Sequence, residues 1–360
     1  MHFGLSETQQ SIKNSAKEFF GAECPIAEVR RLAETEHAME PKLWKKIAEQ
    51  GWTGIIFPEA HDGMGLGYVE MAVAFEEMGR ALVPGPLLST LVAGSVLEHA
   101  ASEDQKKKYL SAICRGEAKG TLALLERSAS WNPADVKLTA ANHTLTGEKL
   151  FVPDAAADFL LVAASDGIHL VPSNAAGVRI MKTPGIDLTR RLYAVTFDNV
   201  PAEPVATGAR ATAALEAALD IAALATAAEM VGGMQRLLDL TVEYAKTRKQ
   251  FGKPIGTFQA VQHQCADMLF YLEGARAAVY YAACLLSEND PGARAAISVA
   301  KAYASDTFRL CGNSAIQVHG GMGFTWENDA HLFYRRAKAS ETAFGDATFH
   351  RERLAKILLD

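Results

Sequence analysis

A basic turn between two expected helices holds the side chain best suited to bind a charged ligand. The run 244–262 reads as the end of one helix, a tight turn that contains Arg248, and the start of another helix. An arginine offers paired donors to phosphate groups, and a helix N-terminus adds backbone N–H donors. This combination suits a cofactor that carries a pyrophosphate. A plainer role stays open, because Arg248 also suits the dipole at a helix C-terminus.

A second run, 317–324, places an amide beside paired glycines. Glycine has no Cβ, so Gly320 and Gly321 let a backbone approach a ligand closely. Taken alone, the pair Gly320 and Gly321 is also typical of a helix stop. Gln317 taken alone is typical of an amide at the protein surface. Another pair, 232–233, lies inside an expected helix, where each glycine costs about 1 kcal/mol of helix propensity. We expect that pair to mark close helix packing.

The histidines and cysteines predict no metal site and no disulfide. The ten histidines lack metal-ligand spacing, and the five cysteines are scattered without a CxxC pair. Thiols of this kind are expected to be reduced, which favours a cytoplasmic protein. The first residues lack the basic and then apolar pattern of a leader, so we expect none.

The composition is that of an ordinary globular protein with a large core. Of 360 residues, 49% are hydrophobic and 22% are charged. The formal net charge is -6 and no tract is rich in lysine or arginine, so we expect neither nucleic acid nor an anionic membrane as a partner. No apolar stretch reaches about 18 residues without charges or breakers, so no membrane span is expected.

The elements that must position these residues change type twice along the chain. Up to about residue 118 apolar side chains recur at helical spacing, and Ser6 followed by Gln9 reads as a helix start. Short apolar runs bounded by turn residues then indicate strands, at 121–125, 144–146, 159–163, 169–171, 178–180 and 194–197. The remainder is helical, with long helices expected at 211–246, 259–288 and 291–317 and a last one after residue 346.

This order of helical, β and helical segments resembles the architecture of the acyl-CoA dehydrogenase family. The runs 244–262 and 317–324 are similar to two signatures of that family. Other similar segments follow in family order, namely 51–59, the glycines at 63, 65 and 67, 76–80 and 197–201. The resemblance covers nearly the whole chain. It implies an α+β, mainly α fold with an N-terminal helical domain (1–118), a central β-barrel-like domain (119–205) and a C-terminal four-helix bundle (206–360).

The resemblance also implies FAD, held across a subunit boundary. In the family, one subunit's β domain holds the flavin ring, and the neighbour's C-terminal helices hold the pyrophosphate and the adenosine. By position, Arg248 would pair with the pyrophosphate. The adenosine side would be lined by Phe251, Gln259, Gln317, Gly320 and Gly321. A homodimer, a homotetramer or a hetero-oligomer with a homologous subunit is therefore expected.

The catalytic base of the family is missing at both of its usual positions. The family removes the α proton of an acyl-CoA thioester with a carboxylate in a dry pocket. By resemblance, Phe344 stands at one base position and Ala222 at the other. Asp346 is the nearest replacement if the segment is extended, because residues i and i+2 then face the same way. Asp346 also reads as the N-cap of the last helix, and Glu341 and Asp220 are weaker candidates.

The segments expected around the flavin ring also depart from the family pattern. Residues 125–131 replace the family's Thr-Glu-Pro…Gly-Ser-Asp segment, and 151–153 replace its Trp-Ile-Thr. Pro153 therefore lacks the hydroxyl that would bond the flavin N5. The half-site for a neighbour's cofactor looks complete, whereas the half-site for this chain's own flavin looks degraded.

Three functions remain open. The first is FAD-dependent α,β-dehydrogenation of an acyl-CoA by this chain, with Asp346 as an atypical base. The second is a non-catalytic partner subunit of a heteromeric acyl-CoA dehydrogenase, which donates Arg248, Gln259 and Gln317 to FAD on a sister chain. Some members acting on bulky acyl-CoAs, including those with steroid side chains, look like this. An electron-transfer flavoprotein is the family's usual acceptor. The third function is an acyl-CoA-binding scaffold that keeps only the fold.

Overall fold

The computed structural model describes residues 4–359, so Met1–Phe3 and Asp360 lie outside the described residues. The expectation that the chain has no leader falls partly on those first three residues. Helical, β and helical elements follow one another along the chain, as predicted. They gather into two compact units, one of residues up to 30, 68–83 and 223–360, the other of 31–67 and 84–222. The division into domains 1–118, 119–205 and 206–360 stays a prediction.

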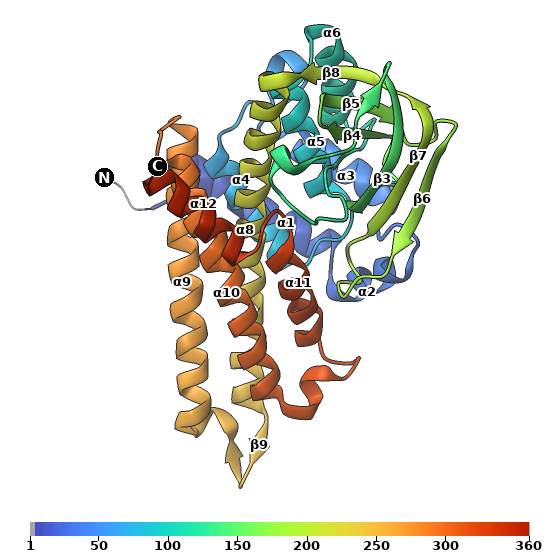
Figure 1. Ribbon diagram of the computed structural model, residues 1–360. Helices are drawn as coiled ribbons and strands as arrows, with labels where there is room; N and C mark the ends of the chain where they lie inside the picture. Colours follow the sequence, from blue (N-terminus) through green and yellow to red (C-terminus); the bar gives the residue numbers. More distant parts are fainter. Residues whose placement is uncertain (1–3, 360) are drawn as a thin grey trace. The chain divides into compact units, whose positions relative to one another are not determined.

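The first unit is helical. Its helices are α1 (Glu7–Glu23), α4 (Tyr68–Arg80), α8 (Gly208–Thr247) from residue 223 on, α9 (Gln259–Ser287), α10 (Ala293–His319), α11 (Ala330–Thr342) and α12 (Ala347–Leu359). α1 starts with a capping box in which Ser6 and Gln9 exchange hydrogen bonds, as the sequence predicts. α4 packs on α1 and α9, and α10 packs on α9, α11 and α12 (Figure 1). α11 is not among the helices predicted from the sequence.

Two neighbouring glycines bring helices of this unit into close contact. A Cβ on Gly232 of α8 would lie 1.7 Å from the Glu76 carbonyl oxygen of α4. A Cβ on Gly233 would lie 2.4 Å from the Phe308 ring of α10. Only glycine fits such contacts, so the prediction that this pair marks close helix packing is confirmed.

α8 is apolar along much of its length. Within residues 4–359 it is the one helix that is long and apolar enough to cross a membrane by length and composition. Of its most apolar window, 72% is buried inside the structure. A helix buried in this way is typical of a protein core.

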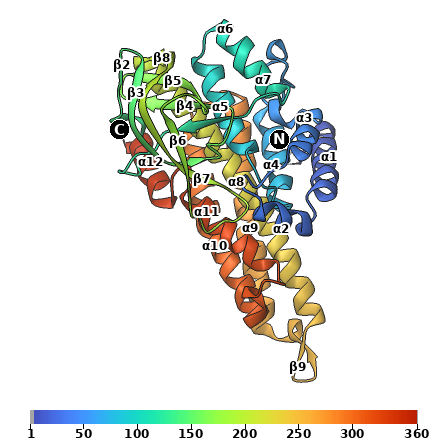
Figure 2. The same ribbon diagram turned by 90° about the vertical axis from the view of Figure 1, so that its right-hand side faces the viewer.

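The second unit contains two four-stranded sheets. One has the order β1 (Gly120–Ala123), β4 (Phe159–Ala164), β5 (Gly167–Pro172), β8 (Glu203–Thr207), and the other β2 (Ala140–Ala141), β3 (Thr144–Pro153), β7 (Leu192–Pro201), β6 (Val178–Thr183). Within residues 4–359, β1 and β4 form the one parallel pair, and the other pairs of the two sheets are antiparallel. Figure 2 labels most strands of the two sheets, which lie next to one another. Leu160 and Val162 of β4 share one core with Val195 and Phe197 of β7. Alternate residues of both sheets thus fill one interior, in agreement with the predicted barrel-like domain.

Short helices complete the second unit. They are α2 (Ile26–Glu34) from residue 31 on, α3 (Pro41–Glu49), α5 (Leu87–Ala100), α6 (Glu103–Gln105) and α7 (Ser111–Cys114). α5 packs on β1. Residues 103–110 form α6 followed by a π-helical stretch, Lys106–Leu110. This register buries Leu110 and lets the Tyr109 hydroxyl donate to Glu203 at 2.8 Å.

Candidate functional site

One end of the helical bundle in the first unit gathers the residues predicted to bind the cofactor. α8 ends and α9 begins there, and a small hairpin, labelled at β9 in Figure 1, joins them. The C-terminus of α10 lies at the same end, because the rings of Tyr244 and His319 stack with centroids 4.4 Å apart. The structure therefore brings the basic turn and the 317–324 run together.

The hairpin holds an exposed aromatic side chain in a strained conformation. β9 (Lys249–Gln250) pairs with β10 (Lys253–Pro254), and Phe251 (φ 54°) and Gly252 (φ 79°) form the two-residue tip. Positive φ at both tip positions is the pattern of a type I′ turn, which asparagine and glycine fit best. Phe251 is 91% exposed, so burial within the chain does not explain its presence. Its ring contacts the Phe258 ring edge-on, with centroids 6.0 Å apart, and is otherwise open to solvent.

Arg248 and the start of α9 present donors at this end. The Arg248 backbone is fixed on both sides, since its N–H donates to Tyr244 O and its carbonyl accepts from Ile255 N, each at 2.8 Å. Its side chain is exposed, and no partner for the guanidinium occurs within residues 4–359. Gln259 is exposed at the first position of α9, which has no side-chain cap. Uncapped N–H groups beside an arginine suit a phosphate.

The two glycines after α10 leave open space. Gly320 has φ 61° and ψ -143°, which favours glycine, and a Cβ there would meet nothing within 4 Å. A Cβ on Gly321 would also meet nothing within 4 Å, and Gln317 is exposed one turn earlier. The chain's own packing therefore does not require glycine at 321. Donors, an exposed ring and an open cradle fit a dinucleotide such as FAD.

His319 and Tyr244 connect the two halves of this site, and sequence reasoning missed both. His319 is 5% exposed, and its Nδ1–H donates to Ala315 O at 2.7 Å. Burial lowers the pKa of the imidazole, so the ring stays neutral at physiological pH. An aromatic residue four positions before the arginine and a histidine directly before the glycine pair were the available signals.

The turn between α11 and α12 contradicts the geometry assumed for Asp346. Phe344 has φ 56° and Gly345 has φ 98°, so the segment is not extended and residues 344 and 346 do not face the same way. The Phe344 side chain is 7% exposed, whereas Asp346 is exposed. An Asp346 oxygen accepts from Phe349 N at 2.8 Å and so caps α12. The alternative role as a helix cap is therefore observed, and the catalytic role stays a prediction.

The other carboxylate candidates are placed differently. Glu341 pairs with Arg309 at 3.2 Å and with Lys338 at 3.3 Å. Asp220 is buried in α8 near Ala222, which is itself fully buried. At both positions where the resemblance puts the base, the side chain is apolar.

The β domain holds an ion pair beside the segments that depart from the family pattern. Lys149 is fully buried and donates to Glu126 at 2.7 Å and to Leu124 O at 3.0 Å. Burial alone raises the pKa of Glu126, but bonds from Lys149 and two backbone amides outweigh it and lower that pKa. Phe151, at φ 51° in a β-bulge, is 44% exposed, and Pro153 ends β3 without a hydroxyl.

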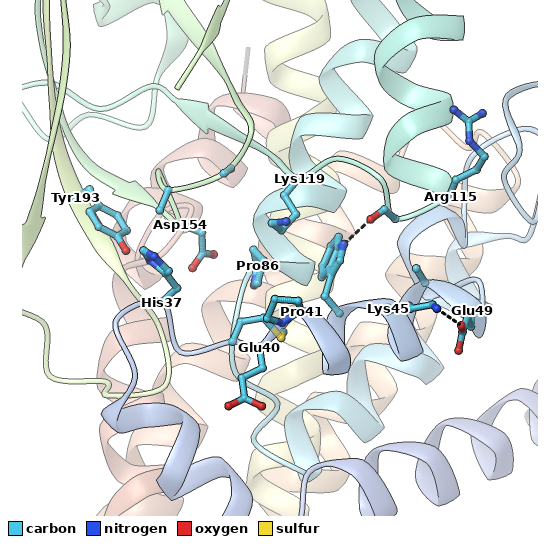
Figure 3. A pocket seen from close by; sticks show the side chains of 16 residues that line it. His37, Glu40, Pro41, Lys45, Glu49, Pro86, Arg115, Lys119, Asp154 and Tyr193 are labelled. Carbon is cyan, nitrogen blue, oxygen red and sulfur yellow. Dashed lines mark hydrogen bonds and ion pairs between the residues drawn. The ribbon is translucent and has the colours of Figure 1, made fainter. Parts of the chain in front are cut away.

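A cavity of about 640 Å³ lies in the second unit, between α3 and the loop after β3 (Figure 3). Trp44 and Tyr193 line it, and the Trp44 indole donates to Gly116 O at 2.8 Å. Charged groups at its edge are already paired, such as Lys45 with Glu49. None of the predicted site residues lines this cavity. Within residues 4–359, no cluster of three metal-ligating side chains occurs.

Comparison with protein families gives two matches. Residues 211–359 match "Acyl-CoA dehydrogenase, C-terminal domain", and residues 6–117 match "Acyl-CoA dehydrogenase, N-terminal domain". Together the two matches cover most of the chain.

Known proteins of similar length match along the whole chain. "Acyl-CoA dehydrogenase IpdE2" of Mycolicibacterium smegmatis is 31% identical over 356 residues, which are 98% of each protein. The solved "Tcur3481-Tcur3483 steroid ACAD G363A variant" is 30% identical over 98% of each chain, with a TM-score of 0.88. The "ChsE4-ChsE5 complex from Mycobacterium tuberculosis" is 25% identical over 100% of this chain and 99% of that chain, with a TM-score of 0.90. Other matching structures contain FAD.

Proposed function

Because this chain belongs to the acyl-CoA dehydrogenase family, whose cofactor is FAD, we propose that it is the partner subunit of a heteromeric enzyme and donates half of the FAD site to a homologous chain. The contrast within the chain carries this proposal. The bundle end keeps an exposed Arg248 and an open glycine cradle, whereas buried Phe344 replaces the base and Pro153 replaces the hydroxyl.

The donated residues would bind the non-reacting part of the cofactor. When bound, FAD supplies the hydride acceptor for α,β-dehydrogenation of an acyl-CoA thioester. The Arg248 guanidinium would offer hydrogen-bond donors to the diphosphate and would offset its charge. The uncapped start of α9 adds backbone N–H donors. The adenosine side is assigned to Phe251, Gln259, Gln317, Gly320 and Gly321.

The names of similar structures support an assembly with two components. One joins two gene products in a steroid enzyme, and another names a complex of two proteins. We extend this to a dimer or tetramer that contains this chain and a homologous subunit. Its substrates would be bulky acyl-CoA thioesters from the degradation of fatty acids or steroid side chains, with an electron-transfer flavoprotein as acceptor and the cytoplasm as location.

Turnover by this chain itself, with Asp346 as the base, is the second candidate. On sequence alone it ranks first, but the cap geometry of Asp346 reverses the order. One observation still favours it, since the Asp346 carboxylate directly follows the turn at the base position. Asp346→Asn keeps a good N-cap and removes the charge. Turnover that is lost in this variant with flavin retained would restore this candidate, and unchanged turnover would remove it.

The test of the main proposal is an absorbance spectrum of the purified chain, alone and co-expressed with a homologous neighbour. We expect little flavin in the chain alone and a flavin-bearing complex with the neighbour. A homo-oligomer that binds one FAD per chain and dehydrogenates a substrate would contradict the proposal. Absence of FAD from every assembly would favour the scaffold function instead.

Two matched charge reversals sharpen this test. Arg248→Glu should strip FAD from the complex, because a carboxylate would then face the diphosphate. Lys246→Glu changes an exposed charge in the last turn of the same helix and should leave the FAD content unchanged. Equal losses from both variants would indicate a general charge effect rather than a binding contact.

A further inference from the structure

The turn between α11 and α12 is held in a conformation that its own residues do not favour. Phe344 adopts φ 56°, a left-handed conformation that is uncommon for a bulky residue. Gly345 follows at φ 98°, and a Cβ there would lie 2.3 Å from the Phe349 ring. A helix–helix connection does not in general need such strain. The surrounding groups must therefore impose it.

Lys301 of α10 is the first of these groups. Its side chain is fully buried, and its ammonium donates to Gly345 O at 2.8 Å. It also donates to the Ser305 hydroxyl at 3.0 Å and to the last carbonyls of α11, Ser340 O at 3.2 Å and Glu341 O at 3.3 Å. One buried ammonium thus fixes the end of α11 and the turn together. A buried charge is costly unless it is hydrogen-bonded, and these oxygen acceptors offset that cost only while the turn keeps its place.

His350 of α12 holds the same turn from the other side. Its ring is 1% exposed, and its Nε2 lies 3.0 Å from Phe344 O. Because a carbonyl only accepts, Nε2 carries the proton. Burial, followed by the charge of Lys301, lowers the pKa of His350 to about 4, so this donor persists through the neutral range. Phe344 O and Gly345 O, adjacent carbonyls, therefore each receive a buried side-chain donor.

We propose that Lys301 and His350 are positioning residues that fix the direction in which residue 344 projects, independently of the residue type found there. Strain that neighbours over-determine is typical of functional sites. The inference uses the proposed function only to identify position 344 as the place of the missing base. In this chain Lys301 and His350 hold the turn so that the Phe344 ring is buried.

The charge of Lys301 makes its hold on the turn depend on pH, which packing alone would not do. Burial lowers the pKa of Lys301 to about 7, and the charges of Asp346 at the start of α12 and Glu341 of α11 oppose that shift. The nearby His350 of α12 stays neutral. An ammonium has three donors and a neutral amine has two, so the hold on the turn should weaken as the pH rises through the neutral range.

Thiol labelling of the full chain in its natural oligomer tests the proposal. Phe344→Cys places a thiol at the turn, and peptide-resolved iodoacetamide labelling follows its rate against exposed Cys284 and fully buried Cys311 of α10. In this background Lys301→Met should speed labelling of the introduced thiol by about tenfold or more, because it removes charged hydrogen bonds to the turn. Lys338→Met alters a lysine of α11 that does not contact the turn carbonyls and should change nothing.

Cys311 reports whether each variant is folded. If Lys301→Met also exposes Cys311, His350→Leu replaces it, since this change removes the donor to Phe344 O without removing a buried charge. Faster labelling of the introduced thiol in a variant with protected Cys311 supports the proposal. Unchanged labelling in both variants with Cys311 protected would overturn it.

The pH profile separates positioning from general packing. Between about pH 6 and about pH 8, the labelling ratio of the introduced thiol to Cys284 should rise when Lys301 is present and stay flat in Lys301→Met. A ratio that stays flat with Lys301 present would also overturn the proposal. Neither measurement needs FAD, so failure here is distinct from failure of the partner-subunit function.

Discussion

The end of the helical bundle and the turn between α11 and α12 use similar backbone devices for opposite results. Each region has one phenylalanine and one glycine at positive φ. They are Phe251 and Gly320 at the bundle end, and Phe344 and Gly345 at the turn. At the bundle end Phe251 is exposed, and Gly320 borders open space. At the turn the side chain is apolar and buried. The backbone conformation of a site can therefore be kept while the chemical group at that site differs.

The largest effect of a single substitution is expected in the β domain. If the pair of Lys149 and Glu126 stabilises the β domain, Lys149→Met should lower the free energy of unfolding by about 3–5 kcal/mol. The substitution leaves the carboxylate of Glu126 without its buried partner. Urea unfolding measures this. Lys137→Met changes an exposed lysine in the segment between β1 and β2 that also holds Glu126, and should have little effect. Similar stability for both variants would mean that the pair does not hold the segment.

Charge reversal at the bundle end has the next largest effect. Arg248→Glu should weaken FAD binding by the assembly by about 2–3 kcal/mol, since a charged hydrogen bond is lost and repulsion is added. Its thermal unfolding should match that of the unmodified chain, because the guanidinium has no partner within residues 4–359. Fluorescence of released flavin measures the first and circular dichroism the second. A cooperative loss of fold would show that Arg248 is structural.

Filling the open cradle separates folding from binding. Gly321→Val should lower FAD affinity by about 1–2 kcal/mol through overpacking against the cofactor, whereas its stability should change only slightly. Calorimetric titration of the assembly, stripped of flavin, gives the affinity. As a control, Gly232→Val at the helix contact should unfold the protein more easily. Undiminished affinity in Gly321→Val would place the cofactor elsewhere.

The smallest effect is expected at the helix cap. Asp346→Ala removes the bond to Phe349 N and should cost about 1 kcal/mol of stability, while Asp346→Asn should cost only a few tenths. Thermal unfolding of both variants measures the difference. Equal stability of the two variants would indicate that the hydrogen bond from Phe349 N to Asp346 contributes little to the stability of the protein.

Much of the fold could be predicted because its signals are local. The long helices and the Ser6 cap follow from apolar spacing and from one polar side chain before a helix. α11 could not be predicted in the same way, because its buried face includes His331, Arg336 and Ser340. Their partners, such as Val83 O for Arg336 at 3.3 Å, lie far away in sequence. A helix that buries polar groups lacks a clean apolar stripe.

The candidate site divides along the same line. Arg248 and the glycine pair stand in local motifs, so their types and order sufficed to name them. The stack of Tyr244 on His319 and the hold of Lys301 on Gly345 depend on tertiary contacts between separate helices. The left-handed conformation of Phe344, which contradicts the extended geometry assumed for Asp346, is not foreseeable from residue type. The catalytic role of Asp346 stays a prediction.

The close contact of α4 and α8 limits how this protein can be engineered for heat resistance. Replacing helical glycines by alanine is a common stabilising strategy worth about 0.5–1 kcal/mol where space allows. Gly21 of α1 is such a place, because a methyl group there would meet nothing within 4 Å. At Gly232 the same methyl group would push two helix backbones apart. A choice of sites by helix propensity alone would include both glycines, and the change at Gly232 would destabilise the protein.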